Sequence, residues 1–155
     1  MDLAIDRVAA PTDEVRELLV ELDAALRGPY LPEQHHALSV DELFSPSVRF
    51  FIARLAGAAV GCGGVAFDDG FAEVKRMYTR PAARGRGVAA GVLQHLEREA
   101  RSAGYSVLRL ETGMYQAAAM AFYAREGFRR CDAFGAYAAM PSRAIETSVF
   151  YEKAI

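Results

Sequence analysis

Arg84-Gly85-Arg86-Gly87-Val88-Ala89 decides how this chain is built, because it joins a strand pattern at 71–79 to a long helical pattern. After the loop, apolar residues recur at helical spacing at Val92, Leu96 and Ala100. The glycines allow a tight turn and leave no side chain in the way of a ligand. The first N–H groups of the helix would point outward, with the positive end of the helix dipole behind them. The loop is therefore a candidate anion site. These six residues are equally consistent with a surface loop that merely precedes a helix.

Two other phosphate-binding motifs fit the loop less well. A P-loop needs Lys and then Ser or Thr directly after its glycines, and Val88-Ala89 stands there instead. The dinucleotide-binding fingerprint needs three spaced glycines and an acidic residue about 20 positions further on. Gly85 and Gly87 supply two of these glycines, but Ala90 takes the third place. Glu111 follows in the next strand, yet the hairpins expected before the loop disagree with a parallel βαβ domain.

The rest of the chain divides into short strands and helices. Strands are expected at 3–8, 48–55, 58–67, 71–79, 106–111, 128–131 and 148–153. Helices are expected from the cap Thr12 to the stop at Gly28, from the capping box of Ser39 and Glu42 to Phe44, and at 88–103 and 116–126. Hairpin-linked strands come first, and strands alternating with helices follow. This order predicts an α+β fold in three layers, with a mixed, mainly antiparallel sheet flanked by helices.

Composition narrows the class of protein. The 155 residues suit one domain, 1–155, with 52% hydrophobic and 25% charged residues. A net charge of −2 gives no reason to expect a nucleic-acid or membrane partner. The N-terminus is acidic where a secretory signal would be basic. Cys62 and Cys131 form no CxxC motif, so we expect reduced thiols and a cytoplasmic location, with one disulfide left open.

The loop is similar to the Arg/Gln-x-x-Gly-x-Gly/Ala signature of the GNAT acetyltransferases, with Arg84, Gly87 and Ala89 at the defining positions. Residues 73–81 resemble the family's fourth strand and the start of its pyrophosphate loop, and 110–128 resemble its fifth strand and following helix. The family's alanine, aromatic and glycine pattern in that helix is matched by Ala119, Phe122, Tyr123, Gly127 and Phe128. The resemblance implies the GNAT acyl-CoA N-acyltransferase fold and the transfer of an acetyl group from acetyl-CoA, a co-substrate, to an amine.

The resemblance also implies how acetyl-CoA is bound. Backbone groups of Met77 and Thr79 would pair with the pantetheine arm, and the amides of 85–90 would bind the pyrophosphate. Gln116 stands where many members carry Asn, so its hydrogen bond would be longer. The side chains of Arg84 and Arg86 would either add charge or lie in solvent. The full expected set is Met77, Tyr78, Thr79, Arg84, Gly85, Arg86, Gly87, Val88, Ala89, Ala90, Gln116, Ala119, Phe122 and Tyr123.

Tyr123 is the catalytic acid that the resemblance implies. It shares one helix face with Gln116 and Ala119, and a tyrosine at this position in the family can protonate the departing thiolate. The thiol has an ordinary pKa near 8.5 and the phenol one near 10, so this proton transfer is only weakly driven. The alternative is a core tyrosine that packs against Phe122 and Phe128.

Glu73 is the candidate base, at the fourth-strand position where some histone acetyltransferases of this superfamily carry theirs. A lysine-type amine has a pKa near 10.4, so its deprotonation at pH 7 costs roughly 4.6 kcal/mol, whereas an α-amino group costs only about 1 kcal/mol. A base is therefore close to necessary for the first acceptor and optional for the second. The alternative is a solvated ion pair between Glu73 and Lys75.

The acceptor site is expected near the loop between the first two helices, where Tyr30, Glu33, His35 and His36 could grip a polar amine or a carboxylate. A plain surface loop is the alternative. No cluster at ligand spacing indicates a metal. A small-molecule amine or amino acid is the favoured partner, and residues 138–147 match nothing. A protein amine, a longer acyl group, a non-catalytic acyl-CoA-binding module and a homodimer stay open.

Overall fold

The computed structural model describes residues 2–155, so Met1 of the predicted domain lies outside the described residues. The strands are β1 (Leu3–Val8), β2 (Val48–Leu55), β3 (Ala58–Phe67), β4 (Ala72–Thr79), β5 (Val107–Gly113), β6 (Arg129–Cys131) and β7 (Ser148–Ala154). The helices are α1 (Asp13–Ala25), α2 (Val40–Leu43), α3 (Val88–Ser102), α4 (Ala117–Arg125) and α5 (Ser142–Ile145). Three short 3₁₀ turns complete the chain, at η1 (Pro32–Gln34), η2 (Pro81–Ala83) and η3 (Gly135–Ala139).

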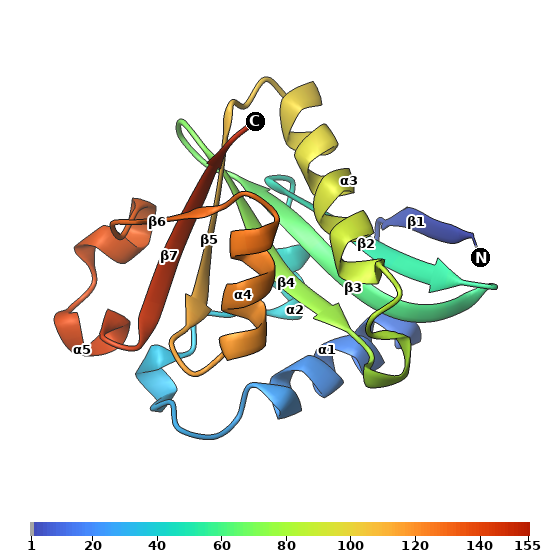
Figure 1. Cartoon of the computed structure of the whole chain (residues 1–155), viewed down its shortest axis with the longest axis horizontal. Coiled ribbons are helices and arrows are strands. Elements are labelled where there is room, and N and C mark those ends of the chain that lie inside the picture. The colour runs from blue at the N-terminus through green and yellow to red at the C-terminus, as the bar shows by residue number, and fades with distance from the viewer. Residues whose placement is uncertain (1) are drawn as a thin grey trace.

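The strands form one sheet in the order β1-β2-β3-β4-β5-β7-β6, and only the β4–β5 pair is parallel. The helices α3 and α4 cover one face, and α1 and α2 cover the other (Figure 1). The predicted fold class, a mixed and mainly antiparallel sheet flanked by helices, is confirmed. In the described chain no helix is both long and apolar enough to cross a membrane.

The predicted helix starts are confirmed in detail, because they depend on local hydrogen bonds. The Thr12 hydroxyl accepts a bond from the Val15 amide at 3.3 Å and caps α1. Ser39 and Glu42 form the predicted capping box of α2. The elements that the sequence did not assign are the three 3₁₀ turns and α5; η3 and α5 lie between β6 and β7.

The parallel pair β4–β5 opens shortly after it begins. Its register holds only at Ala72 with Leu108 and at Glu73 with Arg109. Beyond Glu73 the two strands diverge, although β4 continues to Thr79 and β5 to Gly113. The gap leaves backbone groups of both strands without a strand partner, so a ligand can lie between them.

Candidate active site

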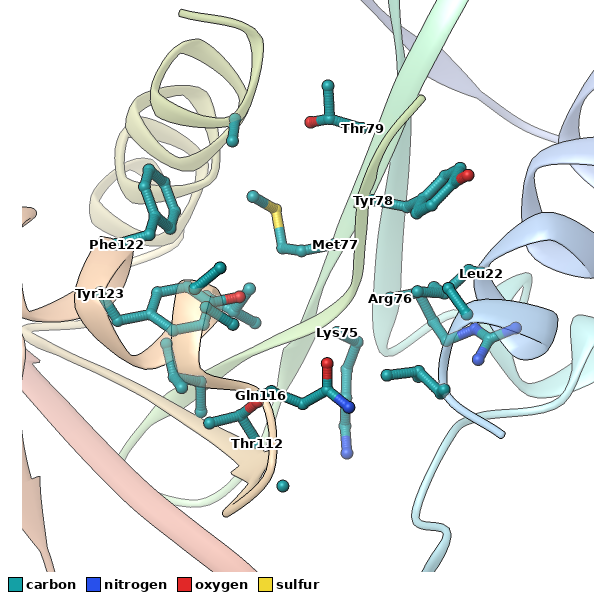
Figure 2. A pocket seen from close by; sticks show the side chains of 18 of the residues that line it. Leu22, Lys75, Arg76, Met77, Tyr78, Thr79, Thr112, Gln116, Phe122 and Tyr123 are labelled. Carbon is teal, nitrogen blue, oxygen red and sulfur yellow. The ribbon is translucent and has the colours of Figure 1, made fainter. Parts of the chain in front are cut away.

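A cavity of about 1040 Å³ occupies the gap between β4 and β5. Its walls are β4, the loop and first turn of α3, the end of β5 with α4, and the end of α1 with the loop that follows it. Figure 2 shows Met77 and Tyr123 on one side of β4 and Arg76 on the other, beside α1. The cavity therefore reaches both faces of the sheet through the gap between the strands.

The glycine loop forms the end of the cavity at α3. Gly85 and Gly87 have φ values of 77° and 80°, the left-handed region that favours glycine, and Gly87 is the N-cap of α3. A Cβ at either position would meet no atom within 4 Å, so the space in front of the loop is open. The first N–H groups of α3 face this space, which suits an anion. Every predicted residue of the loop lines the cavity except Arg86. The Arg84 Nε donates to the Thr79 carbonyl at 3.2 Å.

A β-bulge interrupts β4 at the middle of the cavity. Gly64 pairs with Lys75 and Cys62 pairs with Tyr78, so Gly63 alone faces Arg76 and Met77. Arg76 has a φ of 56°, which is unfavourable for a residue with a side chain. A Cβ on Gly63 would run into the Met77 Sδ, so a glycine is required there.

The bulge changes the direction of the side chains along β4. Val74 and Met77, three positions apart, both pack on the α3 side of the sheet. Arg76 instead contacts Asp23 of α1, on the same side as Lys75 and Tyr78. A regular strand would have sent Arg76 to the α3 side.

Tyr123 lies on the predicted face of α4 and lines the cavity together with Gln116, Ala119 and Phe122. Its ring is buried and lies 5.8 Å from the ring of Phe128 and 5.2 Å from that of Phe122, centroid to centroid. Its hydroxyl points into the cavity (Figure 2). Burial raises the pKa of this phenol, because the charged form loses its solvation. The packing and the catalytic interpretations are therefore compatible, with the ring serving one and the hydroxyl the other.

Glu73 sits where β4 and β5 part, in a network with Lys75 and Tyr137. The Lys75 Nζ lies 2.9 Å from Glu73 Oε2, and the Tyr137 hydroxyl donates to the same oxygen at 2.7 Å. Lys75 also donates to the Tyr137 hydroxyl at 2.8 Å. The pairing of Glu73 with Lys75 is therefore present, but the expectation that it is solvated is wrong. Glu73 is only 8% exposed, because Tyr137 from η3 covers it.

Glu111 is a second carboxylate of this end, and the sequence did not indicate a catalytic role for it. It lines the cavity from β5 and accepts a 2.6 Å hydrogen bond from the Ser148 hydroxyl. Burial is the largest influence on its pKa and raises it, while Ser148, His36 and Lys75 act in the opposite direction. A half-buried acid with a raised pKa in a cavity wall is a signal for function that appears only after folding.

The loop after α1 walls the end of the cavity away from the glycine loop. Of the candidate acceptor residues, Tyr30, His35 and His36 line the cavity, and so does Gln34. The Tyr30 hydroxyl accepts a hydrogen bond from the Tyr115 amide at 3.0 Å. Glu33 is not part of the lining: its carboxylate bonds the Arg143 guanidinium at 2.8 Å, outside the cavity. We therefore leave Glu33 out of the proposed acceptor contacts.

The two cysteines are free thiols, and neither lines the cavity in the part of the chain described. Burial raises the pKa of Cys62 to about 12, which makes it a poor nucleophile. Within residues 2–155 no three His, Cys, Asp or Glu side chains are grouped so as to hold a metal ion. Tyrosine, histidine, lysine and carboxylate side chains, rather than thiols, are therefore the reactive groups that line the cavity.

A cavity with a glycine loop suited to an anion at one end, and with the buried Glu73 and the half-buried Glu111 at the other, suits group transfer from a phosphate-bearing donor to a second molecule. Comparison with known proteins agrees with this class. The acetyltransferase (GNAT) family matches residues 13–128, and the chain belongs to this family. It is an acetyl-CoA-dependent N-acetyltransferase, as predicted.

Individual relatives align over almost the whole chain. An IAA acetyltransferase of Azospirillum brasilense is 42% identical over 154 residues, 98% of this chain and 97% of the relative. A crystal structure from Klebsiella pneumoniae, described as an acyl-CoA N-acyltransferase, has 35% identity and a TM-score of 0.77, with 98% and 97% coverage. A GNAT family acetyltransferase of Elizabethkingia anophelis with acetyl-CoA bound shares the fold, with a TM-score of 0.72 and 18% identity over 99% of this chain and 98% of that one.

Proposed function

We propose that this enzyme acetylates the amino group of a small molecule by direct transfer from acetyl-CoA. The observation that carries the proposal is a pair of hydrogen bonds that fixes the loop walling the α1 end of the cavity. The Gln34 side chain donates to the Arg143 carbonyl at 3.1 Å, and the His36 Nε2 lies 2.7 Å from the Ala144 carbonyl. These bonds fasten the loop after α1, which walls this end of the cavity, to the α5 segment. A wall held in place in this way favours a small acceptor over a protein tail.

The two substrates would enter from opposite faces of the sheet. Acetyl-CoA would bind between α3 and α4, with its pyrophosphate on the amides of 85–90 and its pantetheine arm along Met77 and Thr79. The acceptor would bind on the α1 side, near Glu73 and Glu111. The amine would then attack the thioester carbonyl through the gap between β4 and β5.

Glu111 is the better suited of the two carboxylates to receive the proton of the amine. A general base works best when its pKa lies close to the operating pH, and burial moves the pKa of Glu111 in that direction. One oxygen of Glu73 is already shared by Lys75 and Tyr137. We therefore propose Glu111 as the base, with Glu73 holding the polar network, and we keep the predicted base role of Glu73 as the alternative.

Two further groups would act on the thioester. The N–H of Met77, at the bulge of β4, would stabilise the oxyanion that forms on the carbonyl. The Tyr123 hydroxyl would protonate the departing thiolate from α4. Direct transfer needs no acyl-enzyme, in agreement with the high pKa of Cys62.

The acceptor is tested by thiol release from acetyl-CoA with amino acids, polyamines, aminoglycosides and peptides. IAA is included in this set because the 42% identical relative is an IAA acetyltransferase. We expect turnover with a small amine and little turnover with peptides. Turnover confined to peptides would contradict the small-molecule proposal. Binding of acetyl-CoA without turnover of any acceptor would indicate a non-catalytic binding module instead.

The base is tested by comparing Glu111→Gln with Glu73→Gln at pH 7 and pH 9.5. With an acceptor of high pKa, loss of the base should depress turnover strongly at pH 7 and less at pH 9.5, because about 1.36 kcal/mol of deprotonation cost disappears per pH unit. With an α-amino acceptor, the turnover of the same variant should fall only a little. We expect this pattern for Glu111→Gln. The same pattern in Glu73→Gln alone would assign the base to Glu73, and pH-independent losses in both variants would refute a base role for either.

A further inference from the structure

Arg76 has hydrogen-bonding capacity that the protein itself does not use. Its side chain lines the cavity and is only 5% exposed. Its Nη1 lies 2.8 Å from Asp23 Oδ1, but its Nε–H is shielded from solvent and has no hydrogen-bond partner. Buried polar groups in native proteins are almost always paired. An unpaired Nε–H on a buried guanidinium in a cavity wall is therefore a candidate contact for a ligand.

The backbone holds Arg76 in this position at a conformational cost. The bulge of β4 places Arg76 at a φ of 56° and turns its side chain to the α1 side, where Lys75 also lies. Strained conformations of this kind gather at functional sites, where the surrounding structure enforces them. Figure 2 shows the result: Met77 extends toward α4, and Arg76 extends toward α1.

The chemistry of the free edge points to a carboxylate. The Nε–H and an Nη–H of a guanidinium match the two oxygens of a carboxylate as a pair of parallel hydrogen bonds. Lys75, the neighbouring cation, is already engaged by Glu73 and Tyr137. The partner that Arg76 does have, Asp23, is 55% exposed and can turn to water. Because the Nε–H is covered in this structure, binding of a carboxylate would require the guanidinium to turn from Asp23 toward the cavity.

We propose that Arg76 binds a carboxylate of the acceptor, so that the acceptor class is a small molecule with both an amine and a carboxylate, such as an amino acid. This inference rests on the proposed function, because it names the acceptor of the same site. The amine would lie toward Glu111 and Glu73, and the carboxylate toward α1.

The test compares amino acids with their own carboxamides as acceptors, for the wild type, Arg76→Gln and Arg76→Lys. For each acceptor the kcat/KM of the variant is divided by the kcat/KM of the wild type, so that the different basicity of the two amines cancels. We expect Arg76→Gln to lower kcat/KM for the acids about 10–100-fold, mainly through KM, and to leave the carboxamides within about twofold. Arg76→Lys should recover part of the loss. Arg49→Gln, which removes an arginine paired with Glu99 outside the cavity, is the matched control and should change neither series.

Binding of the same acceptor pairs is also measured by thermal shift in the presence of CoA, so that recognition is read without turnover. Equal losses for acids and carboxamides in Arg76→Gln, or no preference of the wild type for acids in either assay, would overturn the proposal. A preference for amines that carry phosphate would overturn the carboxylate class. Failure of the proposed function looks different: no amine releases thiol, whether or not acids bind through Arg76.

Discussion

The left-handed backbone at Gly87 allows a quantitative test of the acetyl-CoA site. Gly87 has a φ of 80°, and a Cβ there would meet no atom within 4 Å. Gly87→Glu therefore suffers only the conformational cost of a side chain in this region, about 1–2 kcal/mol. For a domain of this size 1 kcal/mol corresponds to about 2–4 °C in Tm, so the variant should melt about 2–8 °C lower.

The same variant should lose its response to the co-substrate. A ligand at 100 times its Kd adds about 2.7 kcal/mol to the stability of the folded state, which is about 5–11 °C for this chain. In Gly87→Glu the new carboxylate lies in front of the first N–H groups of α3 and repels the pyrophosphate. We expect no thermal shift at the acetyl-CoA concentration that shifts the wild type fully.

Gly104→Glu is the matched control for this experiment. Gly104 also has a left-handed φ, 91°, and a Cβ there would meet no atom within 4 Å, but it follows the other end of α3, outside the cavity lining. This variant carries the same new side chain and the same strain, so its Tm should fall by a similar amount and its acetyl-CoA shift should persist. Differential scanning fluorimetry of the three proteins, with and without acetyl-CoA, gives both numbers. Equal acetyl-CoA shifts in the two variants would refute the assignment of the loop as the pyrophosphate site.

Three further predictions concern the walls of the cavity. Tyr123→Phe should lower kcat about 10²-fold or more, because general acid catalysis typically contributes 10²–10⁴, and should keep the acetyl-CoA thermal shift; unchanged kcat would leave Tyr123 a packing residue. Burial raises the pKa of Glu111, so the folded state binds its proton more tightly than the unfolded state, and this contribution to stability is lost as pH rises through the folded pKa. Glu111→Gln should therefore raise Tm relative to the wild type at pH 8 and not at pH 4, and an equal change at both values would refute ionisation as the cause. Gly113→Ala should raise KM for the acceptor, because the new Cβ would overlap the Tyr30 phenol and displace the loop after α1; Gly57→Ala, in the β2–β3 turn where a Cβ meets no atom within 4 Å, should leave that KM unchanged.

The sequence by itself determined most of the elements of this protein and the position of the glycine loop that begins α3. The capping groups of α1 and α2 and the periodic apolar residues act within a few positions of one another. Their patterns can therefore be recognised in the sequence alone. The same holds for the glycines that begin α3, because a left-handed φ is a property of single residues. Predicted element ends differ from the observed ones by only a few residues.

Only the tertiary structure decided what lies at the acceptor end. Tyr137 contacts Glu73, 64 positions away in the sequence, and His36 contacts Ala144, 108 positions away. The segment that holds Tyr137 and Ala144 has no apolar periodicity that would have predicted these contacts. The half-buried position of Glu111 depends on how β4 and β5 part, and no local pattern encodes that separation. The direction of Arg76 depends on the bulge opposite Gly63, where simple alternation along β4 predicts the wrong face. Contacts between distant segments set these features, so they arise only once the chain is folded.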